Sequence, residues 1–283
     1  MQKSNEAILE SLLKRRSFLK NTGIAGLGVA GTALLGTAGL SAIPTAASGV
    51  GSPVTLSAND VAILNFALNL EYLEANFYTE ATTGKSISEI GIPVTGVGRQ
   101  GQVTGGQQVN FDGNPDNVMT IAQQIAEDEQ QHVVLLRTLL GSKAIAQPEI
   151  NLAALGTVST LDEFLAEARA FEDVGVSAYG GAAPLIQSKT VLAIAARIAL
   201  TEGEHTGNLR LLVALNRVPT MKVDAQDILP PPSGTEYFSN VNGLTIVRTT
   251  SEVLAILYGN GTPGTDSGGF FPNGVNGSIN TVA

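Results

Sequence analysis

The chain has 283 residues, contains no cysteine, and carries a formal net charge of −9 at neutral pH. The absence of cysteine excludes disulfide bonds, thiolate metal sites and cysteine nucleophiles. With only 16 Lys and Arg against 25 Asp and Glu, the chain also lacks the basic surface that binding to nucleic acid or to an anionic membrane requires.

The first 48 residues have the order of a secretory signal. A basic leader at 1–20 precedes a stretch at 21–40 without any charged side chain, and small residues at 44–48 provide a cleavage region. The sequence RRSFLK, which begins at Arg15, closely resembles a twin-arginine export signal, a receptor-read address rather than an anchor. We therefore predict recognition by the twin-arginine translocase, cleavage, and a mature protein in the periplasm or outside the cell. An uncleaved membrane anchor is the alternative, which the many Gly and Ala residues disfavour.

The first predicted helix spans about 58–82 and begins at a capping box formed by Ser57 and Asp60. Its apolar residues recur at steps of three and four, which predicts one buried stripe. Glu71 lies within this stripe, and Glu74 lies one turn further along near the same face. The helix therefore carries acidic side chains where apolar ones are expected.

A Gly- and Gln-rich insertion at about 83–113 separates the first helix from the second. It is longer than an ordinary connection, so we interpret it as either a functional lid or a mobile loop. The second helix is predicted at about 115–140. Asn114 is its expected cap, Pro115 suits the first turn, and Gly141 is expected to end it.

The third and fourth helices are predicted at about 160–180 and 189–217. The third begins with a capping box at Thr160, and the Gly-Gly pair at 180–181 is expected to stop it. The fourth is expected to end before Pro219.

The composition changes after the fourth helix. Residues 219–283 are rich in Pro, Gly, Asn and Thr, and they contain one short apolar helix at 251–259. Such a segment cannot form a core alone, so we expect a C-terminal extension that packs on the helical domain, residues 49–218. Phe270 and Phe271 are expected to anchor the extension, with an exposed interaction patch as the alternative.

The only two histidines of the chain occur in the same local pattern. Glu129 precedes His132 by three residues, and Glu202 precedes His205 by three residues. Residues three apart share a face of a helix, so each pair presents a carboxylate and an imidazole to one point in space. Such oxygen and nitrogen donors suit iron or manganese, or zinc less distinctively. One pair is a weak signal, but the two together predict a metal site.

The other two helices each place an acid in an apolar stretch, Glu71 in the first and Glu172 in the third. A buried carboxylate needs a cation or a proton. The chain order is Glu, Glu-x-x-His, Glu, Glu-x-x-His, which is the arrangement described for di-iron and di-manganese carboxylate bundles. Glu74 is an alternative to Glu71, and Asp173 is an alternative to Glu172. The acids expected to be solvated, or to contact ligands without binding metal, are Glu74, Glu127, Asp128 and Glu204.

These features resemble the ferritin-like superfamily. The stretch NLEYLEANFY at 69–78 is similar to the first ferritin helix, where a ligand Glu precedes a buried Tyr by seven residues, here Glu71 and Tyr78. The stretch AYGGAAPLI at 178–186 and the tail resemble a narrower group, the exported ferritin-like proteins related to plant desiccation-related proteins. The resemblance covers essentially the whole mature chain.

The resemblance implies an all-α fold: a ferritin-like four-helix bundle with a long insertion between its first two helices and an irregular C-terminal extension that carries a short fifth helix. It also implies two iron or two manganese ions, with iron slightly favoured. The implied ligands are the bridging Glu129 and Glu202, the terminal Glu71 and Glu172, and one histidine for each ion, His132 and His205.

Three functions follow as hypotheses. The first is an envelope oxidoreductase that oxidises ferrous iron or handles oxygen or peroxide in stress protection, in the manner of a ferroxidase or a manganese catalase. The second is a non-enzymatic desiccation or stress protein that retains the bundle. The third is a binding module that uses 83–113 and the Gly-rich tail. A homodimer is compatible with each of them.

Overall fold

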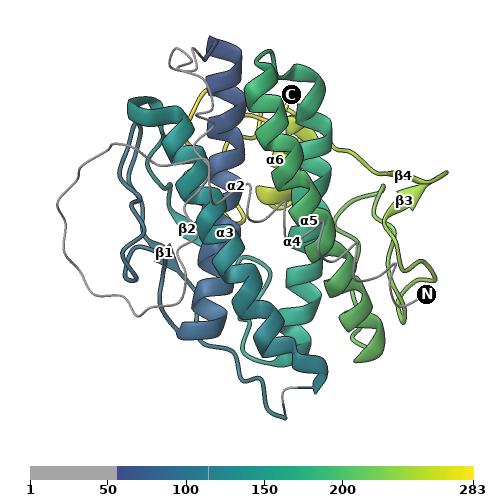
Figure 1. The fold of residues 1–283 in the computed structure, drawn as a ribbon. Helices are drawn as coiled ribbons and strands as arrows, with labels where there is room; N and C mark the ends of the chain where they lie inside the picture. Colours follow the sequence, from purple (N-terminus) through teal and green to yellow (C-terminus); the bar gives the residue numbers. More distant parts are fainter. Residues whose placement is uncertain (1–55, 114) are drawn as a thin grey trace, which may run out of the picture. The chain divides into compact units, whose positions relative to one another are not determined.

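The computed structural model describes residues 56–113 and 115–283, so the predicted signal peptide at 1–48 lies outside the described residues. Four long helices run alongside one another (Figure 1), which confirms the predicted all-α four-helix bundle. None of the helices in this part of the chain is long and apolar enough to cross a membrane. The helices are α2 (Ala58–Thr83), α3 (Val118–Leu140), α4 (Leu161–Ala182), α5 (Lys189–Leu215) and the short α6 (Thr250–Leu257).

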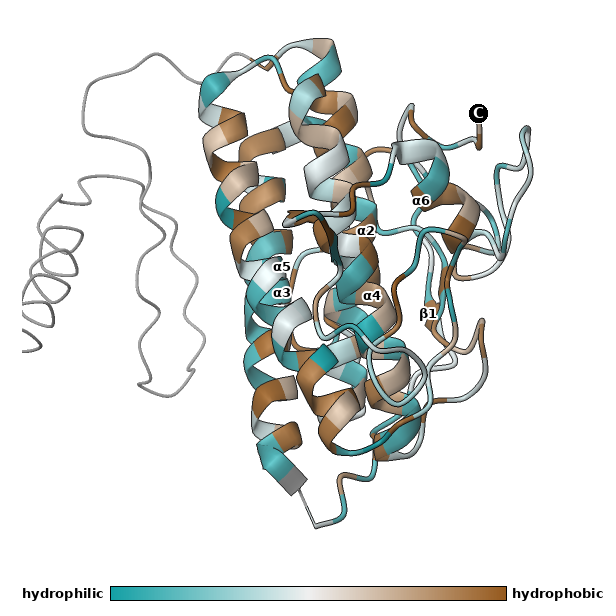
Figure 2. Ribbon diagram, turned by 90° about the vertical axis from the view of Figure 1, so that its right-hand side faces the viewer, coloured by the Kyte–Doolittle hydropathy of each residue, from teal (hydrophilic) through white to brown (hydrophobic). Residues whose placement is uncertain are grey.

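The bundle consists of two helix pairs. α2 packs along α3, and α4 packs along α5. Hydrophobic and hydrophilic residues alternate along α3 and α5 (Figure 2), as expected when one face of a helix is buried. The strands are short: β1 (Val103–Thr104) pairs in parallel with β2 (Ile150–Asn151), and β3 (Asn240–Val241) forms a hairpin with β4 (Leu244–Thr245).

The helix starts test the capping predictions. Capping boxes are present at Ser57 and at Thr160, as predicted. The start of α3 differs from its prediction. Pro115 begins a short 3₁₀ turn, and the N-cap of α3 is Asn117 rather than Asn114, which itself lies outside the described residues. Asp116 and Asn117 have positive φ angles of 52° and 58°. Because this left-handed backbone is not α-helical, α3 begins only at Val118.

The helix ends test the stop signals. Gly141 ends α3 with a φ of 56°, as predicted. α5 ends at Leu215, two residues earlier than predicted, because Arg217 adopts a left-handed backbone with a φ of 57°. The Gly-Gly pair at 180–181 does not stop α4, which continues to Ala182.

The glycine pair has a packing role instead. A Cβ atom at Gly181 would overlap the carbonyl oxygen of Arg248, and one at Gly180 would lie 2.6 Å from the Cγ1 of Val247. The two glycines therefore let the backbone of the C-terminal extension cross directly over α4. The predicted stop signal is therefore a site of close backbone approach.

The insertion at 83–113 pairs along its length with the α3–α4 connection. Besides the β1–β2 pair, Val97 bridges to Ile145 and Asn110 bridges to Thr160. The N–H of Gly101 donates to the carbonyl of Gln147 at 2.9 Å. The insertion is thus a layer over α2 that is hydrogen-bonded to the α3–α4 connection.

This layer and the extension bury α2 on every side, so the prediction of a single buried stripe is also wrong. Amide side chains of α2 face the covering segments. Asn76 donates to the Oε1 of Gln147 at 2.9 Å, and Asn69 donates to the carbonyl of Asn276 at 2.8 Å. Polar residues on the outer face of α2 therefore satisfy the backbone of its cover rather than contact water.

The C-terminal extension is fixed by aromatic packing and by buried ion pairs. Phe270 and Phe271 are buried, and the ring centroid of Phe270 lies 5.1 Å from that of Phe171 on α4. The two aromatic residues thus anchor the extension, as predicted.

Arginine side chains supply the ion pairs. Arg169 pairs with Asp227 at 2.8 Å, and Arg210 pairs with Asp173 at 2.6 Å. Arg169 also reaches Asp173 at 3.2 Å. Asp173 therefore neutralises arginines from two helices, which excludes it as the alternative to Glu172 in the core.

Replacing Asp173 by Ala should lower the free energy of unfolding by about 3–5 kcal/mol, because the change leaves Arg210 buried without its carboxylate. The exposed Asp162 of the same helix is the control, and Asp162→Ala should cost less than about 1 kcal/mol. Chemical denaturation of both variants measures the difference. Equal stabilities of the two variants would contradict the role given to the buried ion pair.

Adding a methyl group at Gly181 should also destabilise the fold, because Gly181→Ala forces the extension away from α4. Overpacking of this kind costs about 1–3 kcal/mol. Gly207 on α5 is the matched control, since a Cβ atom there would meet nothing within 4 Å. Gly207→Ala should stabilise the protein by about 0.5–1 kcal/mol. Opposite signs in thermal denaturation are the expected result.

Candidate metal centre

The structure brings all six predicted ligand residues together in the core of the bundle. Each helix contributes as expected: one Glu comes from α2, one from α4, and one Glu-x-x-His pair comes from each of α3 and α5. The four carboxylate side chains have no exposed surface, and the two imidazoles are buried as well. The residues are Glu71, Glu129, His132, Glu172, Glu202 and His205.

The donor atoms form two overlapping sets, and within each set all the atoms lie within 4.8 Å of one another. Glu129 and Glu202 belong to both sets. Glu71 and His132 complete the first set, and Glu172 and His205 complete the second. The geometry therefore has two centres that share two carboxylates.

Both imidazoles direct the same nitrogen into the cluster. The Nδ1 of His132 lies 3.2 Å from Glu71 Oε2 and 3.1 Å from Glu129 Oε2. The Nδ1 of His205 lies 3.0 Å from Glu129 Oε1 and 3.3 Å from Glu172 Oε2. The ring centroids are 6.5 Å apart. The Nδ1 atoms are thus the nitrogens available to a metal ion.

The buried polar atoms test whether the site suits cations. Seven side-chain atoms of these residues have no hydrogen-bond partner although they are buried, including both oxygens of Glu172, both oxygens of Glu202 and the Nδ1 of His205. Buried polar atoms without partners are rare and costly. A cation at the point where they converge would satisfy them, so the donor set fits divalent metal ions.

The electrostatics of the cluster point the same way. Burial and the neighbouring carboxylate of Glu129 raise the pKa of Glu202 well above its ordinary value. Burial also raises the pKa of Glu71 to about 7. Burial alone would lower the pKa of His132, but the carboxylates of Glu71 and Glu129 raise it well above its ordinary value. So many carboxylates are stable together only with protons or metal ions among them.

Two further residues hold the predicted ligands from outside. The hydroxyl of Tyr179 on α4 donates a short hydrogen bond to Glu71 Oε1. Asp128 on α3 lies 3.2 Å from the Nε2 of His205, the nitrogen that faces away from the cluster. A carboxylate on the outer nitrogen fixes the orientation of a ligand histidine and makes it a stronger donor. The contact of Asp128 is one of the two environments predicted for it, whereas no pattern in the sequence predicts the contact of Tyr179.

Glu74, the alternative to Glu71, belongs to neither donor set. It is buried, so of the two environments predicted for it, solvated or beside the ligands, the structure excludes the first. A Cβ atom at Gly175 would lie 2.7 Å from Glu74 Oε1 and 3.1 Å from Glu202 Oε2. The glycine thus makes room on α4 for both carboxylates.

The remaining acids agree with their predictions. Glu127 and Glu204 are exposed.

Tyr78 is buried, and burial together with the carboxylate of Glu172 raises the pKa of its hydroxyl well above the ordinary value. Tyr78 also packs edge-to-face against Phe164, with ring centroids 5.9 Å apart.

Fold and site together define a class of protein, the four-helix bundles with a carboxylate- and histidine-rich centre in the core. The Ferritin-like domain family matches residues 59–215, more than half of the chain, and the chain belongs to this family. The chain is similar to the ferritin-like catalase Nec2 of Nesocodon mauritianus, with 24% identity over 272 residues that cover 78% of this chain and 84% of that protein. No solved structure matches at a significant level.

Removing the outer carboxylate of His205 should weaken metal binding. Asp128→Asn should lower the affinity for a divalent metal about 10- to 100-fold, the usual effect of losing such a partner. The neighbouring exposed Glu127 is the control, and Glu127→Gln should leave the affinity unchanged. Competition with a chelator of known affinity measures both. An equal effect of the two changes would indicate only a loss of surface charge.

Proposed function

We propose that the chain holds two redox-active metal ions in its core and uses them to break down hydrogen peroxide. The observation that carries this proposal is the pair of overlapping donor sets that share Glu129 and Glu202. Two ions held by common carboxylates can act as one unit. The name of the relative, a ferritin-like catalase, supports peroxide over ferrous iron as the substrate.

The proposed ligands balance the charge of the ions. Four carboxylates would offset two divalent ions, and each ion would take one imidazole nitrogen. Mixed oxygen and nitrogen donors of this kind suit iron or manganese. When bound, such a pair supplies and recovers the two electrons that convert two molecules of hydrogen peroxide into two of water and one of oxygen.

The protein's own residues manage geometry and protons. Tyr179 fixes Glu71, and Asp128 fixes His205, so the donors are held before a substrate arrives. Burial and the carboxylates of Glu202 and Glu172 raise the pKa of Glu74 well above its ordinary value. Glu74 therefore holds a proton more readily than a free carboxyl group does. We assign it the role of a proton donor and acceptor beside the centre.

Metal content and peroxide turnover test the proposal together. Protein supplied with iron or with manganese should contain about two ions per chain, and it should release oxygen from hydrogen peroxide. Glu129→Gln should lower both the metal content and the turnover, the latter by at least about 10²-fold. The exposed Glu204→Gln is the control on α5 and should change neither.

Glu74→Gln separates the proton role from a ligand role. It should keep two ions per chain and lower turnover about 10²-fold, within the range expected for loss of a general acid–base. A loss of metal in this variant would instead make Glu74 a ligand.

The other outcomes select the other functions. A loaded protein that oxidises ferrous iron but not peroxide would be a ferroxidase-like enzyme. A loaded protein with neither activity would support the non-enzymatic stress protein. A metal content near zero in a folded protein would reject the centre itself.

A further inference from the structure

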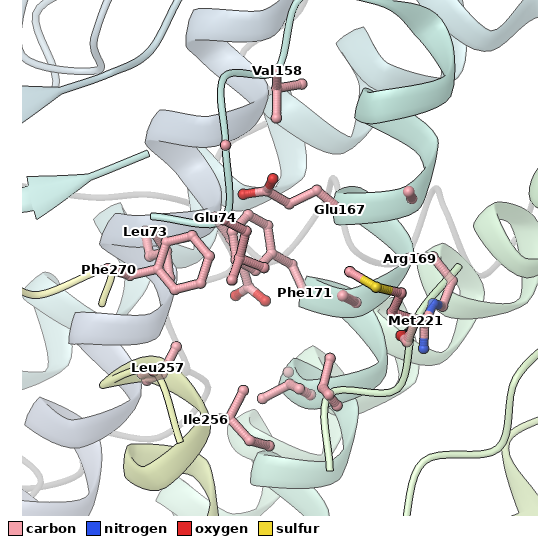
Figure 3. Close-up of a pocket in the computed structure, with 18 of the residues that line it drawn as sticks. Leu73, Glu74, Val158, Glu167, Arg169, Phe171, Met221, Ile256, Leu257 and Phe270 are labelled. Atoms are coloured by element: carbon pink, nitrogen blue, oxygen red, sulfur yellow. The ribbon is translucent and has the colours of Figure 1, made fainter. Parts of the chain in front are cut away.

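A cavity of about 580 Å³ lies beside the bundle between α4, α6 and two loops, at about 155–158 and 221–223. Its inner wall is apolar and includes Leu73, Phe171 and Phe270 (Figure 3). Its rim carries exposed side chains such as Leu155 and Met221, so the cavity is open to a molecule from solution. The volume is in the range of sites that bind small organic molecules.

One carboxyl group in this wall has an oxygen atom without a hydrogen-bond partner among the residues that the structure describes. The side chain of Glu167 extends from α4 into the cavity (Figure 3), and the residue is only 8% exposed. Its Oε1 atom is buried without a hydrogen-bond partner. Burial raises the pKa of Glu167 to about 8. Glu167 belongs to neither donor set of the metal centre, so that centre does not account for it.

The cations near the cavity do not serve this carboxyl group. Two of the three guanidinium nitrogens of Arg169 are occupied by Asp173, Asp227 and the carbonyl of Met221, whereas its Nε is buried without a hydrogen-bond partner among the described residues. Lys222 is exposed at the rim. The Oε1 of Glu167 therefore requires a hydrogen-bond donor that arrives with the ligand, because a buried acceptor without a donor is costly.

We propose that this cavity binds a small organic molecule with an apolar body and one hydrogen-bond-donating group, a hydroxyl or an amine, which donates to the carboxyl of Glu167. The apolar body lies against Phe171 and Phe270. A molecule whose polar group is a carboxylate has no hydrogen to donate, and its charge is repelled as Glu167 ionises. This binding needs no metal and is independent of the peroxide reaction.

The cavity shares part of its wall with the candidate metal centre. Glu74 and Gly175 form part of its wall, and the Cβ position of Gly175 is close to both Glu74 and Glu202. A bound molecule therefore lies on the other side of a wall that the metal centre shares. The affinity of the cavity for a ligand can therefore be measured first in metal-free protein and then in metal-loaded protein.

Three probes with one ring system test the proposal. The full chain is titrated at pH 9, above the pKa of Glu167, with 2-(1-naphthyl)ethanol, 2-(1-naphthyl)ethylamine and 1-naphthylacetate, and binding is followed by calorimetry. The alcohol and the amine should bind saturably with one site per chain. The acetate should bind at least 10-fold more weakly. Equal binding of all three, or no saturable binding of the alcohol and the amine, would overturn the proposal.

Variants then place the probes in the cavity. Glu167→Leu should weaken binding of the alcohol and amine at least 10-fold, whereas Glu167→Gln, which keeps an acceptor, should remain within about 3-fold of the parent. Ala166→Trp fills the cavity from α4 and should abolish binding. Ala193→Trp, at an exposed position of α5, should leave it unchanged. Unchanged affinity in both Glu167→Leu and Ala166→Trp would show that the probes bind elsewhere.

Discussion

Charge balance in the bundle core is the constraint on which the rest of the structure depends. Five carboxylates and two imidazoles meet there, almost without contact with water. Water cannot neutralise them, so only protons, metal ions and a few hydrogen bonds can. The surrounding residues follow from this need: a tyrosine and an outer aspartate hold ligands, and Gly175 leaves space where any side chain would collide with them.

A second system of buried charges is kept apart from the first by the geometry of a single helix. Glu172 and Asp173 are consecutive in α4, and successive residues of a helix point about 100° apart. Glu172 therefore faces the bundle core, whereas Asp173 faces Arg169 and Arg210. The first residue belongs to the candidate centre, and the second pairs with the two arginines that bond to the C-terminal extension. α4 thus connects the two systems without mixing their charges.

The sequence was sufficient to predict those features of the fold and of the site that depend on residues a few positions apart. The two Glu-x-x-His pairs converge because helical spacing alone puts their side chains on one face, and the capping boxes depend on residues three apart. Prediction failed for contacts between segments that are far apart in the sequence. Nothing near Gly181 in the sequence shows that the backbone of Arg248 crosses it, and nothing near Tyr179 shows that it faces Glu71. The cavity is assembled from several separate segments, so no single stretch could indicate it.

The cover over α2 has a consequence for how the molecule opens. Amide hydrogens exchange with solvent when a segment unfolds locally, and helices at a protein surface do so far more often than those in the interior. α2 is enclosed by its partner helices, by the 83–113 layer and by the extension. Its amides can therefore exchange only when the whole domain unfolds, while the exposed β3–β4 hairpin exchanges readily. We therefore expect the helix that carries Glu71 to be the slowest-exchanging element of the described domain.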